Sequence, residues 1–285
     1  MKHILIPTDF SDCAHYAFEV AAQISRKSGG TLHLVHVYER PVYDVHNPGI
    51  DIMENSKLRK HIDEEMEKLK EAEFAKDLKI KTHVIPDRTL TELLESDGYK
   101  DLDLIVMGSH GASGWKELLI GSNTEKVVRT ANCPVITVKK RHENFTLNDI
   151  VFASTFYTEV ESVFPKIKRI AELFEATIHL VKVVTRTHFE TTLLSYKLMN
   201  DFAEKFELKD YSVNTFNDDD LEDGIIHFSE HINADMIALT THGRTGFSHI
   251  INGSLAEDVV NHVNRPVLSV KIKEKKVNYG VIFPD

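Results

Sequence analysis

The chain has 285 residues, 42% of them hydrophobic and 27% charged, which is ordinary for a globular protein of one large or two average domains. Its formal net charge of −10 argues against a broad basic surface, so we expect no nucleic-acid partner. The two cysteines, Cys13 and Cys133, lie far apart and suggest no disulfide framework. The sequence has neither a long apolar N-terminal run nor a span of about 18 apolar residues. Together these features predict a cytoplasmic protein without a membrane partner.

Strands and helices are predicted to alternate through the first half of the chain. Short apolar runs predict strands over 2–6, 31–37, 79–85, 104–107 and 134–139. Apolar residues at helical spacing predict helices over 12–28, 56–76, 89–96 and 122–130, while 39–55, with two prolines, is expected to be irregular. The expected helix caps are Ser11, a capping box of Thr89 with Glu92, and a capping box of Ser122 with Glu125.

The second half of the chain repeats the first. Residues 101–139 align with 233–271 without a gap, and 15 of these 39 positions are identical. The beginning of the chain also recurs, with 4–10 aligning with 150–156. A repeat of this length indicates a duplicated domain. We expect domain 1 over 1–140, domain 2 over 147–273 and a tail over 274–285.

Alternating strands and helices predict two tandem Rossmann-like α/β domains, each with a five-stranded parallel sheet covered by helices on both faces. In such sheets, ligands bind beyond the carboxyl ends of the strands, where the strand order reverses. If the first and fourth strands are neighbours there, Asp9 faces the glycine-containing loop that begins at Gly108. Glycine turns and helix N-termini bind phosphate, and a carboxylate can hold a ribose hydroxyl or a base amine. The pattern therefore predicts a nucleotide site.

The sequence resembles the universal stress proteins in three features that occur in order, twice. These are the Pro7-Thr8-Asp9 turn, the spacing Gly108-x2-Gly111-x9-Gly121-Ser122, and the ending Cys-Pro-Val-Ile-Thr-Val. The resemblance implies a role in stress survival, ATP binding in one subgroup, and domains that pack through their last strands, with a homodimer as a further option. Carried over to this chain, the nucleotide-binding residues would be Pro7, Thr8, Asp9, Val37, Met107, Gly108, His110, Gly111, Gly121, Ser122, Asn123 and Thr124. Asp9 and the loop hydroxyls are able to hold Mg²⁺ through the phosphates.

The second copy departs from this pattern. Thr155 stands where Asp9 does, and Thr240 stands where Gly108 does. We therefore expect the second site to be weaker, empty or limited to an anion held by His242, Gly243, Gly253 and Ser254.

Several alternatives stay open. No P-loop lysine or nucleophile elbow is present, so we predict a nucleotide-binding regulatory protein and not a dedicated enzyme. A slow ATPase or phosphotransfer enzyme using His110 or Thr124 is the runner-up, and a nucleotide-free scaffold is the third. Asp9 could instead cap the helix that follows it. His227 and His231 lie four residues apart on a predicted helix, but two ligands are too few to predict a metal site.

Overall fold

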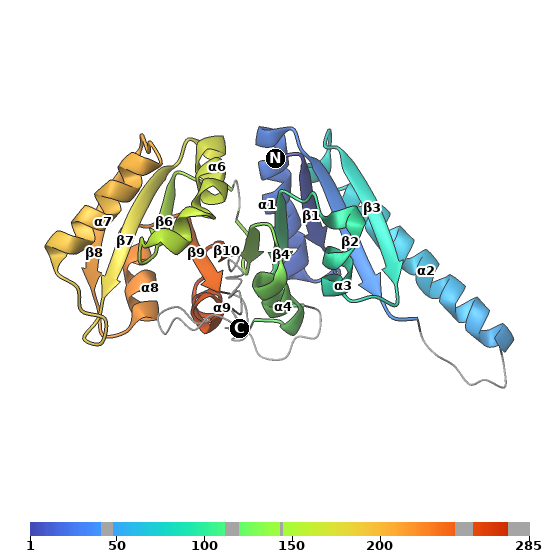
Figure 1. Cartoon of the computed structure of the whole chain (residues 1–285). Coiled ribbons are helices and arrows are strands. Elements are labelled where there is room, and N and C mark those ends of the chain that lie inside the picture. The colour runs from blue at the N-terminus through green and yellow to red at the C-terminus, as the bar shows by residue number, and fades with distance from the viewer. Residues whose placement is uncertain (41–47, 112–119, 143–144, 243–252, 273–285) are drawn as a thin grey trace, which may run out of the picture.

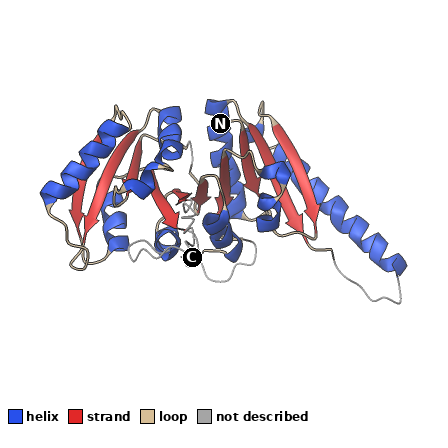
Figure 2. Ribbon diagram, viewed as in Figure 1, coloured by secondary structure: helices blue, strands red, loops and turns tan. Residues whose placement is uncertain are grey.

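The computed structural model describes residues 1–40, 48–111, 120–142, 145–242 and 253–272. Figure 1 shows two α/β halves side by side, and Figure 2 shows strands layered between helices in each. The strands of domain 1 are β1 (His3–Pro7), β2 (Thr31–Tyr38), β3 (Ile80–Pro86), β4 (Leu104–Gly108) and β5 (Val135–Val138). Its helices are α1 (Asp12–Ser28), α2 (Pro48–Lys70), α3 (Leu90–Glu95) and α4 (Ser122–Thr130), with the 3₁₀ turns η1 (Glu73–Ala75) and η2 (Asp97–Tyr99).

Domain 2 repeats this order. Its strands are β6 (Asp149–Ala153), β7 (Thr177–Val184), β8 (Tyr211–Asn217), β9 (Met236–His242) and β10 (Val267–Ile272). Its helices are α5 (Thr158–Glu161), α6 (Phe164–Phe174), α7 (Thr192–Lys205), α8 (Leu221–His231) and α9 (Gly253–His262). The helix that follows the first strand is continuous in domain 1 but divided into α5 and α6 in domain 2.

All described strands belong to one sheet of ten, in the order β3-β2-β1-β4-β5-β10-β9-β6-β7-β8. Within each half all neighbouring strands are parallel, which confirms the predicted fold class. The halves join through β5 and β10, which pair antiparallel with Ile136 opposite Leu268. In each half the order reverses beside the first strand, so the loops after β1 and β4 meet at one edge.

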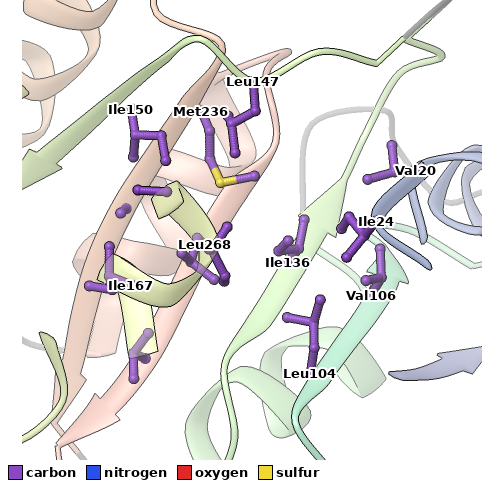
Figure 3. Close-up of a cluster of buried hydrophobic side chains, with 14 of the residues drawn as sticks. Val20, Ile24, Leu104, Val106, Ile136, Leu147, Ile150, Ile167, Met236 and Leu268 are labelled. Carbon is purple, nitrogen blue, oxygen red and sulfur yellow. The ribbon is translucent and has the colours of Figure 1, made fainter. Parts of the chain in front are cut away.

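The hydrophobic core differs between the two faces of the sheet. On the α1 and α6 face, one cluster of buried side chains crosses the junction, and Figure 3 shows Ile136 and Leu268 from the two halves within it. On the other face the core is divided, with α3 and α4 covering one cluster and α8 and α9 covering another. Alternate residues of each strand supply the two faces, as Leu104 and Val106 do against Ile105 and Met107.

The sequence misplaced the start of one helix and the cap of another. Helix α2 begins at Pro48, well before residue 56, and ends at Lys70. Proline lacks an amide hydrogen that the first turn of a helix does not use, so the prolines of 39–55 do not exclude a helix there. Helix α4 spans Ser122–Thr130 as predicted, but its N-cap is Gly121 and it has no side-chain cap, so the Ser122–Glu125 capping box is absent. The Glu125 carboxylate instead contacts Arg129 one turn later, at 3.0 Å. The Ser11 cap and the Thr89–Glu92 capping box are confirmed.

Candidate functional site: a crevice at the carboxyl edge of domain 1

A cavity of about 300 Å³ opens at the carboxyl ends of β1, β2 and β4 and the N-terminus of α4. This volume lies at the lower end of the range usual for small-molecule sites. The twelve residues predicted from the sequence all line it, together with three more that the sequence pattern did not single out. These three are Ala14 of α1, Val35 of β2 and Leu90 of α3. Val35 could have been found, because it lies two residues before Val37 and so faces the same side of the strand.

One end of the crevice is apolar. Val35, Met107 and Leu90 are buried there as part of the core beneath α3 and α4, with Val37 packed against them. The backbone amide of Thr8 donates to the Val35 carbonyl at 2.8 Å and so joins the turn after β1 to β2. This end therefore offers apolar side chains against which a planar ring system can pack.

The turn after β1 holds the Asp9 carboxylate in place. Phe10 adopts a left-handed backbone conformation, with φ of 65°, and its amide donates to the Thr8 hydroxyl at 3.1 Å. Asp9 Oδ1 accepts from the Ser11 hydroxyl at 2.6 Å and from the Ser11 amide at 3.1 Å. The Ser11 hydroxyl in turn accepts from the Ala14 amide at 3.3 Å, so Ser11 caps α1 and Asp9 supports the cap from outside. The alternative in which Asp9 itself caps the helix is therefore wrong.

Gly111 and Gly108 have different spatial roles. A Cβ on Gly111 would lie 2.5 Å from Asp9 Oδ2, so the loop after β4 and the Asp9 carboxylate meet across the crevice as predicted. A Cβ on Gly108 would instead lie 2.8 to 2.9 Å from backbone atoms of Cys13 and Ala14. The absence of a side chain at Gly108 thus lets α1 pack closely against the end of β4. The sequence pattern predicted that this space is used by an anion, but α1 fills it.

The N-terminus of α4 forms the polar end of the crevice. Gly121 is the N-cap and provides no side-chain acceptor for the first amides of the helix. Ser122, Asn123 and Thr124 follow in the first turn, where amide groups have no partner inside the helix. The Thr124 hydroxyl donates to the Gly108 carbonyl at 2.8 Å and so joins the helix to the end of β4. Because Ser122 is not the N-cap, its hydroxyl does not have the competing role expected from the sequence.

Two histidines lie next to the crevice. His110 lines it, and its Nδ1 is 2.8 Å from the Ser109 hydroxyl. His36 was not predicted. Its Nδ1 donates to the Thr8 carbonyl at 2.7 Å, and its ring packs on Phe10 with centroids 4.6 Å apart. Burial lowers the pKa of His36, more strongly than this hydrogen bond and the Asp9 charge raise it. His36 is therefore a neutral brace behind the Asp9 turn at neutral pH.

The equivalent edge of domain 2 keeps the turn but changes the chemistry. The Ser154 hydroxyl accepts from the Phe156 amide at 3.3 Å, and Phe156 is again left-handed with φ of 60°. Thr155 and Thr240 replace Asp9 and Gly108, and Thr240 is fully buried. Of the predicted anion ligands, Gly243 and the side chains of His242 and Ser254 lie outside the described part of the chain, whereas Gly253 begins α9.

Two further polar groups have structural explanations. His227 Nδ1 lies 2.8 Å from Asp218 Oδ2, and the described residues contain no cluster of three metal-ligating side chains. Asp149, His179 and Ser212 form a hydrogen-bonded chain with both contacts at 2.7 Å. Domain 1 has His3, His33 and His83 in a similar chain across its first three strands, at 3.1 and 3.2 Å. The same three strand positions thus carry hydrogen-bonded side chains in both domains, but the residue types differ. We therefore interpret both rows as links between neighbouring strands and not as a Ser-His-Asp triad.

The structure is a tandem of two Rossmann-like domains with a crevice at the carboxyl edge of the first. The chain belongs to the universal stress protein family, whose model matches residues 1–139 and 149–271. No helix in the described ranges is long and apolar enough to cross a membrane.

Known relatives match either the whole chain or one half of it. Universal stress protein Slr1230 of Synechocystis is 23% identical over 95% of this chain and its own full length. Universal stress protein MJ0577 of Methanocaldococcus jannaschii is 30% identical over 50% of this chain and 96% of its own length. A solved universal stress protein of Archaeoglobus fulgidus has a TM-score of 0.67 at 18% identity, covering 95% of this chain and 97% of that one, which shows the shared fold.

Proposed function

We propose that the domain 1 crevice binds a nucleotide, ATP or a close relative with or without Mg²⁺, and that binding alters the conformation or association of a stress-response protein. The observation that carries this proposal is the convergence of Asp9, Gly111 and the uncapped start of α4 on one cavity with an apolar floor. A base fits against the floor, a ribose hydroxyl within reach of the carboxylate, and phosphates at the helix N-terminus. The Ser122 and Thr124 hydroxyls stand where they can assist the phosphates or a Mg²⁺ ion.

A direct contact links this site to domain 2. Asn261 of α9 is buried, and its side-chain oxygen accepts a hydrogen bond from the backbone amide of Ile120, next to Gly121. The backbone carbonyl of Asn261 accepts from Lys139 Nζ at 2.5 Å. A nucleotide that tightens the start of α4 would therefore also act on α9. We propose that pairing through β5 and β10 is the working arrangement of the two domains, and a homodimer remains a prediction.

Isothermal titration calorimetry of the full chain with ATP, with and without Mg²⁺, tests the proposal. Asp9→Ala removes one charge-assisted hydrogen bond, worth about 1.5–3 kcal/mol, so the affinity should fall about ten- to a hundredfold. Asp12→Ala is the matched control, because Asp12 is an exposed acid of α1 that does not line the crevice. Equal ATP affinity in the Asp9 variant and in the control would refute the assignment.

A further inference from the structure

A second cavity lies in domain 2 at the place that matches the nucleotide crevice. It has a volume of about 180 Å³ and is lined by residues from the loop after β6, the end of β7 and the helices α8 and α9. Figure 1 shows where these elements lie in domain 2. Its walls are largely apolar, and Ala153, Val183, Leu221, Ile225 and Leu255 form them. The sequence predicted a site here that is weaker, empty or limited to an anion, whereas apolar walls suit an uncharged ligand.

Two polar side chains of the first crevice are replaced in the second. Thr155 stands where Asp9 does, and Leu255 of α9 stands where Asn123 of α4 does. Domain 2 thus has a hydroxyl in place of the carboxylate that would hold a ribose. It has an isobutyl side chain in place of the side-chain amide at the start of the helix. A phosphorylated ligand would lose charge-assisted contacts here and would bury its charge against hydrocarbon, which is unfavourable.

The charged groups of the lining already neutralise each other. Lys182 Nζ lies 2.5 and 2.6 Å from the two carboxylate oxygens of Glu190, and Lys182 is buried. Glu190 also accepts from the Tyr157 hydroxyl at 3.1 Å and from the Ser195 hydroxyl at 3.2 Å. The Lys182–Glu190 pair therefore has its hydrogen bonds made within the protein and carries no net charge. An anion would gain little from Lys182 unless it displaced Glu190.

Exposed apolar side chains lie in this cavity's lining and on the start of α7, which follows it in the chain. Tyr157 and Phe189 line it yet are 49% and 77% exposed, and Leu193 and Leu194 follow on the adjacent start of α7 at 84% and 44%. Among the described residues, the large apolar side chains that are exposed all fall in this neighbourhood or in the nearby α7, apart from Tyr211. Exposed apolar surface concentrated around a cavity marks a binding site more often than chance scatter does.

We propose that this cavity binds a small, neutral, mainly apolar molecule, about the size of one aromatic ring or a fused pair of rings. An engineered apolar cavity of about 150 Å³ takes benzene, so 180 Å³ admits a ligand of this class. The ligand would lie on the Leu221, Ile225 and Leu255 wall, and Tyr157 and Phe189 would cover it. The two halves of the chain would then recognise different ligand classes, and domain 2 would not be a decayed copy of domain 1.

Titration calorimetry of the full chain with indole as the probe tests this proposal. We expect one indole per chain, and indole should still bind when ATP is present at saturation. Leu255→Trp fills the cavity and should weaken indole binding by about tenfold or more. The matched variant Asn123→Trp places the same side chain at the equivalent position of domain 1 and should leave indole binding intact while it weakens ATP binding.

Indole binding that survives Leu255→Trp, or that is lost in Asn123→Trp or competed by ATP, would overturn the proposal, as would the absence of saturable binding. A second measurement needs no variant and so does not depend on the folding of Leu255→Trp. Indole-3-acetate has the same rings plus a carboxylate, and because the Lys182–Glu190 pair is neutral it should bind about tenfold more weakly than indole. Equal or tighter binding of the anion would also overturn the proposal.

Discussion

Replacing Gly108 by alanine tests how the domain 1 crevice is built. A Cβ at Gly108 would lie 2.8 Å from the Cys13 carbonyl carbon and 2.9 Å from the Ala14 backbone nitrogen, whereas ordinary contacts begin at 3.4 Å. Both atoms belong to the backbone of α1, so no side chain can rotate away and the helix itself must retreat by several tenths of an ångström. Overpacking of this kind costs about 1–3 kcal/mol.

Urea denaturation of the full chain, followed by circular dichroism, measures the effect. With a urea slope of about 1–3 kcal/mol per molar, Gly108→Ala should lower the midpoint of domain 1 unfolding by about 1 M. Gly121→Ala is the matched control, because its nearest neighbour would be 3.5 Å away and its N-cap position should cost at most about 1 kcal/mol. An unchanged midpoint for Gly108→Ala, or a larger loss for Gly121→Ala, would refute the packing role of Gly108.

Three further predictions follow from single contacts. Gly111→Ala places a methyl group 2.5 Å from Asp9 Oδ2, which is the movable end of a side chain. Calorimetry should therefore show about tenfold weaker ATP binding, with little change in the urea midpoint of unfolding. A decrease in the midpoint as large as that of Gly108→Ala would contradict this. Asn261→Ala removes the acceptor of the Ile120 amide and should weaken ATP binding several-fold although Asn261 does not line the crevice, whereas the exposed control Asn200→Ala should not. Burial, with smaller effects of His83 and His3, lowers the pKa of His33 to about 4, so the folded chain resists a proton that the unfolded chain accepts below about pH 6.5. The free energy of unfolding should thus fall as the pH drops from 6.5 towards 4, by roughly 1–2 kcal/mol at pH 5 for this partly buried ring, and His33→Gln should flatten that fall; an identical pH profile in the variant would exclude His33 as its source.

The sequence predicted the domain 1 crevice well because its physics is simple. In a parallel sheet the carboxyl ends of all strands lie at one edge, and a reversal of strand order brings two of the loops together. The Pro7-Thr8-Asp9 turn after β1 and the loop that begins at Gly108 after β4 are therefore expected to meet at this edge. Leu90 was not predicted from the sequence, because its position in the cavity depends on how α3 packs against the sheet.

Other features depended on contacts between distant residues. Ser122 and Glu125 match a capping box, but Glu125 contacts Arg129 and the N-cap of the helix is Gly121. The role of Gly108 depends on how closely α1 approaches β4, which local sequence does not encode. Part of the lining of the second cavity comes from Lys182 of β7 and from Phe189 and Glu190 beyond the end of that strand. This region has no recognisable motif, so only the tertiary structure reveals the cavity.

The stoichiometry of bound nucleotide tests the central claim most directly. Native mass spectrometry of the full chain with added Mg-ATP should show one nucleotide per chain, and Asp9→Ala should lose it. Two nucleotides per chain would mean that Thr155 and Leu255 are compatible with a nucleotide site, so that the chemical division between the domains is wrong. No bound nucleotide at all would contradict nucleotide binding by the domain 1 crevice and favour a scaffold that works through protein contacts.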